Sequence, residues 1–337
     1  MENPFKFLRI TADPGCNFAC IYCNPKKESN PNMMTTSEVI ETVRAGFQLG
    51  IKIVHLTGGE PTKRKDIVEL VAGIKNEGVE TIEMTTNGAL FYKMAENLAN
   101  AGLTGVNISL DTLNQDKFKL ITGVDALHLV LGSIEKARNL FGSHVSINMV
   151  VMKDNLDEMR DFVEFSRKTG VMVRFCELTP QGPYMEASPD FFAQNHVPKE
   201  DILNAIREIA PIDDLKRDQF DKQNAHSEYY TLGGEYQDMT IGIIAPFSNG
   251  WPCPGAGCTR LRIGPTGGNS CVIYPERRLI GLTFEEKKIV IRELIDERRH
   301  QMDNNLFPAQ HEAEYGPYRF GLLKKSPVEI SLTSDLN

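Results

Sequence analysis

The chain has 337 residues and a formal net charge of −8 at pH 7, which disfavours a general nucleic-acid binder because such proteins need a basic surface. No run approaches the roughly 18 apolar residues that span a membrane. The start Met1-Glu2-Asn3-Pro4 does not resemble a signal peptide, so we expect a cytoplasmic protein. Seven cysteines in such a protein indicate metal ligands rather than disulfides.

The first predicted strand, residues 6–12, is followed by three cysteines with the spacing C-x3-C-x2-C, namely Cys16, Cys20 and Cys23. Thiolates are soft ligands that suit zinc or iron–sulfur clusters. A loop this short can bring three of them to one metal centre but supplies no fourth, whereas a structural zinc site normally has four protein ligands. The spacing therefore favours a cluster with one iron open to a small molecule.

From residue 6 to about 210, short β-branched runs alternate with longer helical patterns. Strands are predicted over 6–12, 52–57, 80–86, 105–110, 145–152 and 171–177. Helices are predicted over 36–49, 65–77, 91–101, 129–141, 156–169 and 199–209. Six strand–helix repeats imply an α/β fold with parallel strands and right-handed crossovers, either an open doubly wound sheet or a partly closed barrel.

Polar motifs lie at the carboxyl ends of these strands, where ligands collect in both architectures. In chain order they are Thr57-Gly58-Gly59-Glu60-Pro61, Thr85-Thr86-Asn87-Gly88, Ser109-Leu110-Asp111, Asn148, and Arg174 with Cys176 and Glu177. We therefore expect the active site at this edge of the sheet. Cys176 is interpreted as a buried small side chain, and the seven histidines, which show no two-ligand spacing, as structural or surface residues.

The C-terminal part carries a second cysteine group, Cys253, Cys258 and Cys271. Arg260 and Arg262 lie two residues apart, so on a strand both side chains would face the same way, and guanidinium groups suit phosphate oxygens. A further helix is predicted over 284–302. We expect a barrel formed by residues 1–215 and a small separate unit formed by residues 216–337.

The cysteine loop together with the Gly-Gly-Glu-Pro turn resembles the radical S-adenosylmethionine enzymes. Leu8-Arg9-Ile10, the strand-end motifs and Cys258-Thr-Arg260-Leu-Arg262 are most similar to the GTP 3′,8-cyclase family. This resemblance implies a partial (βα)6 TIM-like barrel with a small C-terminal auxiliary-cluster domain. It also implies that Cys16, Cys20 and Cys23 hold a 4Fe-4S cluster whose open iron binds S-adenosylmethionine. The implied cofactor contacts are Tyr22, Gly58, Gly59, Glu60, Pro61, Thr86, Asn87, Ser109 and Arg174.

The same resemblance implies a second 4Fe-4S cluster on Cys253, Cys258 and Cys271. The implied substrate contacts are Arg9, Arg64, Arg260 and Arg262. The implied function is an enzyme, of the lyase or cyclase type, that generates a 5′-deoxyadenosyl radical and abstracts hydrogen from a phosphorylated nucleotide such as GTP. The enzyme would need an external electron donor of the flavodoxin or ferredoxin type. A homodimer is also compatible with the resemblance.

Two departures from the family pattern leave alternatives open. The second group reads C-x4-C-x12-C rather than C-x2-C-x13-C, and the sequence ends Ser334-Asp335-Leu336-Asn337 rather than in a Gly-Gly tail. One alternative is a paralogue that acts on another nucleotide or a phosphorylated sugar in a specialised pathway. The others are a peptide-modifying two-cluster enzyme and a non-enzymatic zinc or iron–sulfur protein.

Overall fold

The computed structural model describes residues 3, 5–23, 30–179, 189–212, 227–246, 248, 259–268 and 277–303. Its strands form one sheet with the order β7-β8-β6-β5-β4-β3-β2-β1-β9. The strands are β1 (Phe7–Asp13), β2 (Ile53–Gly58), β3 (Thr81–Thr86), β4 (Gly105–Ser109), β5 (Val145–Val151), β6 (Met172–Glu177), β7 (Ser227–Thr231), β8 (Thr240–Ile244) and β9 (Arg260–Ile263). Neighbouring strands are parallel, except that β7 pairs antiparallel with β8.

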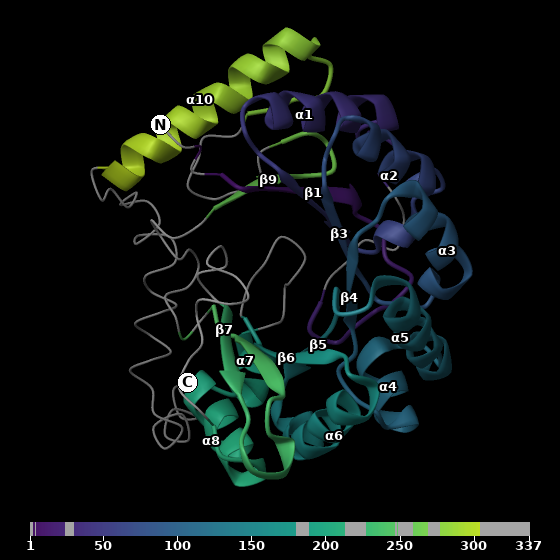
Figure 1. Ribbon diagram of the computed structural model, residues 1–337, viewed down its shortest axis with the longest axis vertical. Helices are drawn as coiled ribbons and strands as arrows, with labels where there is room; N and C mark the ends of the chain where they lie inside the picture. Colours follow the sequence, from purple (N-terminus) through teal and green to yellow (C-terminus); the bar gives the residue numbers. More distant parts are fainter. Residues whose placement is uncertain are drawn as a thin grey trace, which may run out of the picture.

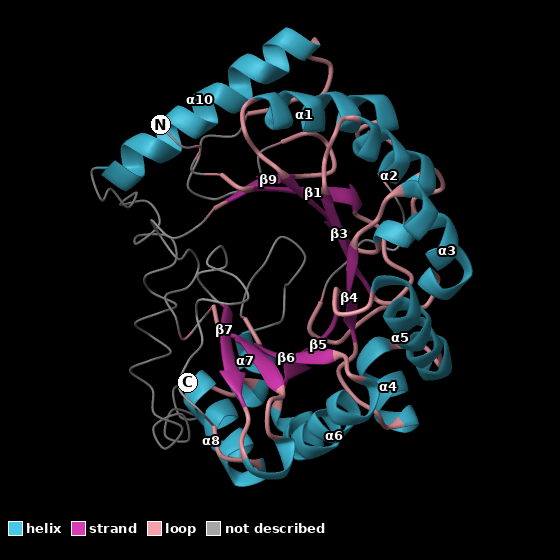
Figure 2. Cartoon of the chain, viewed as in Figure 1, coloured by secondary structure: helices cyan, strands magenta, loops and turns pink. Residues whose placement is uncertain are grey.

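Helices cover the convex side of this curved sheet (Figures 1 and 2). They are α1 (Thr36–Gln48), α2 (Ile67–Asn76), α3 (Phe91–Ala101), α4 (Gln115–Thr122), α5 (Leu127–Phe141), α6 (Met159–Thr169), α7 (Pro189–Asn195), α8 (Lys199–Ile209) and α10 (Phe284–Asp303). Short 3-10 turns lie at Pro61–Lys63, Lys153–Glu158 and Gly234–Tyr236. Within the described residues, no helix is both long enough and apolar enough to cross a membrane.

The predicted α/β architecture with a partial parallel barrel is confirmed. All six predicted strands and all six predicted helices of the first 210 residues are present, close to their expected bounds. The sequence reading missed α4, α7, β7 and β8. Helix α4 is short, and its N-cap is Asn114, whose side-chain oxygen accepts hydrogen bonds from the N–H groups of Asp116 and Lys117. Hydrophobic periodicity does not reveal such a local cap.

Each strand of the barrel has one apolar face and one polar face. Side chains such as Leu8 and Ile10 of β1 and Val54 and Leu56 of β2 are buried toward the helices. The residues that alternate with them, including Arg9, Glu83, Asn107, Asn148 and Arg174, are only partly buried. Because side chains alternate across a strand, this second set faces the concave interior. The barrel interior is therefore lined with polar groups.

The described C-terminal strands extend the barrel sheet at both edges. Strand β8 pairs with β6, and β9 pairs with β1 so that Arg262 lies beside Arg9. The division into residues 1–215 and 216–337 stays a prediction, because Cys253, Cys258 and Cys271 lie outside the described residues.

Helix α10 packs on α1 through a largely buried ion pair. The Lys287 side chain is 1% exposed, and its Nζ lies 2.5 Å from Oε2 of Glu41 on α1. Ile291 and Leu294 are buried beside it. An ammonium in such a place is costly unless a carboxylate compensates it.

We predict that Glu41→Gln loosens α10. Glu41 is 34% exposed, so we expect a loss of about 1–2 kcal/mol in the free energy of unfolding rather than the full cost of a broken buried pair. Hydrogen exchange should quicken over residues 284–303. Glu285→Gln changes an exposed residue of the same helix and serves as the control. Unchanged exchange in α10 would contradict the prediction.

Candidate active site

The cysteine loop follows β1 and is fastened to the end of α4. The N–H groups of Ala19 and Ile21 donate to the carbonyls of Thr122 (2.8 Å) and Ile121 (2.9 Å). The buried ring of Phe18 meets Phe118 of α4 edge-on, with a centroid separation of 5.8 Å. The short loop is therefore held by backbone bonds and an aromatic contact, and this fixes the directions of its thiols.

The three predicted cluster ligands lie near one another. Burial raises the pKa of Cys16 and raises that of Cys20 well above its usual value, and the charges of Cys16 and Cys23 add to the effect at Cys20. Burial first, then Cys16 and Asp111, raise the pKa of Cys23 to about 11. Bound iron would act in the opposite direction, because it stabilises the deprotonated thiolates and so lowers the pKa values of the three cysteines. Among the described residues, no three His, Cys, Asp or Glu side chains could share a single metal ion, whereas a cluster takes each thiolate on a different iron.

The Gly-Gly-Glu-Pro turn lies directly against the residues that precede Cys16. The N–H of Gly59 donates to the carbonyl of Asp13 (2.9 Å), and the N–H of Glu60 donates to that of Gly15 (2.8 Å). A Cβ at Gly58 would stand 2.0 Å from the Asp13 oxygen, and one at Gly59 would stand 2.5 Å from the Pro14 oxygen. Only glycine allows this approach.

Glu60 joins this turn to the turn after β3. Its side chain is fully buried, and it accepts hydrogen bonds from Oγ1 of Thr86 (2.6 Å), N–H of Asn87 (2.6 Å) and N–H of Thr62 (3.0 Å). Burial raises the pKa of Glu60, although these hydrogen bonds oppose the shift. The carboxylate is engaged on both oxygens, so Glu60 is a positioning residue, and a ligand at this turn would meet its backbone.

Asn87 and Tyr22 tie the loop to neighbouring strand ends. The Asn87 amide lies 2.8 Å from Oδ1 of Asn17 and 3.6 Å from Sγ of Cys16. The Tyr22 hydroxyl donates to Asp111 at 2.6 Å, and burial raises the pKa of Asp111 to about 6. Asp111 belongs to the strand-end motif Ser109-Leu110-Asp111, but the sequence does not identify it as a site residue.

Four arginines gather on the inner face of the sheet. Arg9 and Arg262 are register partners, the Arg260 guanidinium lies 5.8 Å from the ring centroid of Phe7, and Nε of Arg174 donates to Asn148 at 2.8 Å. All four lower the pKa of His55, after the larger effect of its burial. We call Arg9, Arg174, Arg260 and Arg262 the arginine belt.

His55 is an inner-face residue that the sequence reading missed. Its Nε2 lies 2.8 Å from Oγ1 of Thr85, and its Nδ1 lies 3.8 Å from the carboxylate of Glu83. The available signal was its alternation with Val54 and Leu56, which are buried toward the helices. Cys176 lies on the inner face of β6, two residues after Arg174, and burial raises the pKa of its thiol to about 12.

Arg64 lies away from the belt. It is 3% exposed, and its Nη1 donates to the carbonyls of Ala12 and Met34, each at 3.1 Å. Its Nε donates to Asp66 at 2.9 Å. These partners occupy the guanidinium, so the geometry disfavours the phosphate contact that the resemblance implied for Arg64.

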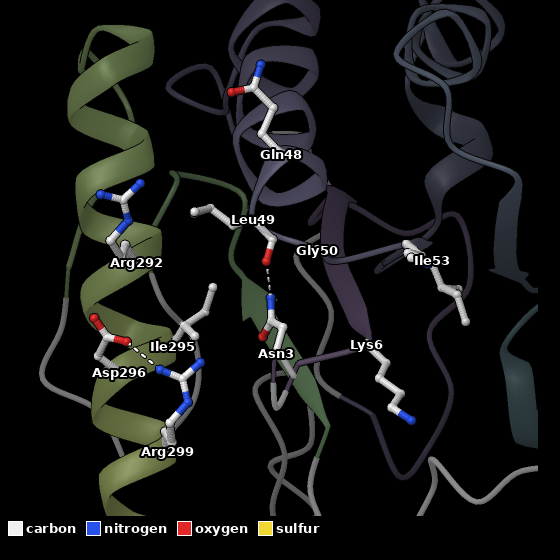
Figure 3. A pocket seen from close by; sticks show the side chains of 11 residues that line it. Asn3, Lys6, Gln48, Leu49, Gly50, Ile53, Arg292, Ile295, Asp296 and Arg299 are labelled. Carbon is white, nitrogen blue, oxygen red and sulfur yellow. Dashed lines mark hydrogen bonds and ion pairs between the residues drawn. The ribbon is translucent and has the colours of Figure 1, made fainter. Parts of the chain in front are cut away.

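A separate pocket of about 780 Å³ lies between α10, the end of α1 and the start of β1 (Figure 3). Its lining includes Lys6 and Ile53, at the amino ends of β1 and β2, and Arg292 of α10. The cysteine loop follows the carboxyl end of β1. The pocket therefore lies at the other end of the strands and is not part of the candidate site.

We predict that Gly59→Ala prevents cluster assembly. The new methyl group would meet the Pro14 and Gly15 carbonyl oxygens at 2.5 and 2.6 Å, so the loop must shift. Anaerobic iron reconstitution should leave the N-terminal site largely empty. Gly132→Ala, where the nearest atom lies 3.5 Å away on Tyr92, is the matched control. Normal iron content in Gly59→Ala would contradict the close approach.

Comparison with known proteins identifies the family of this chain. Residues 11–166 match the model of the Radical SAM superfamily. The chain is 32% identical over 303 residues to a probable GTP 3′,8-cyclase of Metallosphaera sedula, covering 88% of this chain and 90% of that protein. It is 33% identical over 296 residues to the GTP 3′,8-cyclase of Thermodesulfovibrio yellowstonii, covering 86% and 85%.

Among solved structures, Streptococcus suis SuiB bound to S-adenosylmethionine has a similar fold, with a TM-score of 0.63 and 16% identity. The match covers 83% of this chain and 64% of SuiB, and at this identity it supports the fold alone. Sequence similarity over nearly the whole length of the cyclases is the more specific finding. The chain belongs to the radical SAM superfamily and, within it, to the family of the GTP 3′,8-cyclases.

Proposed function

We propose that this radical SAM enzyme carries two clusters and cyclises a phosphorylated purine nucleotide, with GTP as the first candidate. The arginine belt is the observation that carries the proposal. Its four permanently charged groups line the concave interior, below the strand ends that hold the cysteine loop. Guanidinium groups bind phosphate oxygens through forked, charge-assisted hydrogen bonds.

The residues at the strand ends fit the cofactors that the superfamily implies. Cys16, Cys20 and Cys23 would hold the 4Fe-4S cluster, and the Gly58–Gly59 turn would offer its backbone to S-adenosylmethionine. When bound and reduced, this pair would supply a 5′-deoxyadenosyl radical. The protein itself would position the cysteine loop. The Asn87 amide contacts the loop at Cys16, and the hydrogen bond from Tyr22 to Asp111 holds the other end of the loop. Hydrogen bonds to cluster sulfur also tune its potential.

The second cluster and the remaining contacts belong to the same proposal. Cys253, Cys258 and Cys271 would bind it, although these residues lie outside the described part of the chain. Thr86, Ser109, Pro61 and Arg174 stay predicted cofactor contacts, and Arg174 shares the inner face with the other arginines of the belt. An external one-electron donor of the flavodoxin or ferredoxin type would supply the reducing equivalent, and a homodimer stays a prediction.

A paralogue with another phosphorylated substrate is the second candidate, and the groups beside the arginine belt are compatible with it as well as with GTP. The Glu83 carboxylate and the buried ring of His55 share the inner face with the arginine belt. The low pKa of His55 means that it adds no positive charge at neutral pH. The interior therefore combines four cations with a carboxylate and neutral donors, which suits a substrate that has both phosphate and hydrogen-bonding groups.

Iron content tests the two-cluster proposal. The anaerobically reconstituted protein should hold about eight irons per chain, four for each cluster. Replacing Cys253, Cys258 and Cys271 by alanine should leave about four, and so should replacing Cys16, Cys20 and Cys23. Stoichiometric zinc without a brown chromophore would instead support the structural-metal alternative.

Nucleotide-dependent cofactor cleavage tests the substrate. With dithionite and S-adenosylmethionine, GTP should accelerate formation of 5′-deoxyadenosine and give a new product by mass spectrometry, more than ATP or GMP does. Arg262→Ala should weaken nucleotide binding about tenfold or more, because a hydrogen bond to a charged group contributes about 1.5–3 kcal/mol. Arg167→Ala, 49% exposed on α6, is the control. Unchanged GTP binding in Arg262→Ala would rule out the belt as the phosphate site.

A further inference from the structure

The Asn87 side chain directs one amide hydrogen at the sulfur of Cys16. Its nitrogen lies 3.6 Å from Sγ of Cys16 and donates a second hydrogen bond to Oδ1 of Asn17 at 2.8 Å. Its oxygen accepts from the N–H of Ala89 at 3.1 Å, which fixes the end of the amide that carries the hydrogens. An asparagine amide has two N–H donors, so one goes to Asn17 and the other to the sulfur.

The backbone that carries this amide is held by a buried carboxylate. The N–H of Asn87 donates to Glu60 at 2.6 Å, and Oγ1 of Thr86 donates to the same carboxylate at 2.6 Å. The N–H of Gly88 in turn donates to Oγ1 of Thr86 at 3.1 Å. Asn87 is itself only 9% exposed. Because a satisfied buried network is rigid, the amide donor is held in place by the fold before any cofactor binds.

The Cys16 sulfur receives two N–H groups in all among the described contacts. The N–H of Phe18 lies 3.4 Å from the same Sγ. Burial raises the pKa of Cys16, and the hydrogen bonds from Phe18 and Asn87 oppose that shift. Both donors therefore stabilise negative charge on this sulfur. Only the donor of Asn87 belongs to a side chain, so it is the one that a substitution can remove without changing the backbone.

Charged side chains near the loop act on the thiols with opposite signs. In addition to burial, the charge of Glu60 raises the pKa of Cys16, whereas the charge of Lys63 lowers it. In addition to burial, the charge of Asp111 raises the pKa of Cys20. The two buried carboxylates thus disfavour further negative charge at the loop. The amide hydrogen on Cys16 works against them.

We propose that Asn87 raises the reduction potential of the N-terminal cluster by donating its amide hydrogen to the Cys16 sulfur. The inference rests on the proposed function, which places that cluster on Cys16, Cys20 and Cys23. On reduction, one electron passes from the external donor protein to the cluster, and no bond forms or breaks. The added negative charge is shared with the ligand sulfurs, and a hydrogen bond to a more negative acceptor is stronger. Asn87 therefore favours the reduced state, a role that is separate from the cofactor contact that the resemblance implies.

A redox titration of the anaerobically reconstituted enzyme tests the proposal, followed by electron paramagnetic resonance without S-adenosylmethionine. We expect Asn87→Ala to lower the equilibrium constant for reduction about tenfold, which is about 59 mV toward more negative potential for a one-electron couple. Asn87→Asp should lower it further, because it keeps an acceptor for the Ala89 N–H but puts a negative oxygen near the sulfur. Asn32→Ala, which alters an exposed asparagine, is the control and should leave the potential unchanged. The same titration with Cys253, Cys258 and Cys271 replaced by alanine assigns the signal to the N-terminal cluster.

The other outcomes separate this inference from the proposed function. An unchanged or less negative potential in Asn87→Ala overturns the inference alone. Loss of iron from both Asn87 variants also overturns it, because Asn87 would then be needed for assembly; if only one variant keeps its iron, the potential of that variant decides. An unmodified protein without an N-terminal cluster refutes both the inference and the proposed function. If the potential shifts as expected but no nucleotide gives a product, the proposed function fails and the role of Asn87 stands.

Discussion

The close approach of the Gly58–Gly59 turn to the backbone of residues 13–15 is the constraint on which the site depends. Two strand ends that are neighbours in the sheet are brought closer than any side chain permits, since a Cβ at Gly58 would stand 2.0 Å from a carbonyl oxygen. The turn after β2 is thereby locked to the start of the cysteine loop. A cofactor that spans the cluster and this turn would find both parts at a fixed separation, and preorganisation of this kind lowers the entropic cost of binding.

Glu60 extends the same constraint to the third strand end. It is fully buried, and the hydrogens of Thr62, Thr86 and Asn87 compensate its charge. Asn87 then reaches back to Asn17 and Cys16. The loop, the glycine turn and the turn after β3 thus form one hydrogen-bonded unit. Loss of a member should disturb all three, because a half-satisfied buried network is costly.

Sequence reasoning succeeded where the signal is local and periodic. Arg260 and Arg262, two residues apart, do lie on a strand, β9, where they pair with Phe7 and Arg9 of β1. Arg64 follows a 3-10 turn rather than a strand, so no alternation indicates where its side chain points, and its substrate contact stays a prediction that its buried hydrogen bonds disfavour. His55 was overlooked for a different reason. A search for pairs of metal ligands passes over a single histidine. That His55 lies between Arg9 of β1 and Glu83 of β3 follows only from the strand register, which the sequence does not give.

Of the two helices that periodicity missed, α4 and α7, it is α4 that contacts the cysteine loop. Helix α4 has eight residues, too few for a sustained apolar pattern, yet its last turn accepts two backbone hydrogen bonds from the loop. Ile121 and Phe118 are buried against the barrel, while Leu120 between them faces outward. Because Leu120 is exposed, α4 holds the loop through the Phe118 ring and through the backbone carbonyls of Ile121 and Thr122. The side chains of the cysteine loop are thus oriented by a helix whose own position depends on its buried residues.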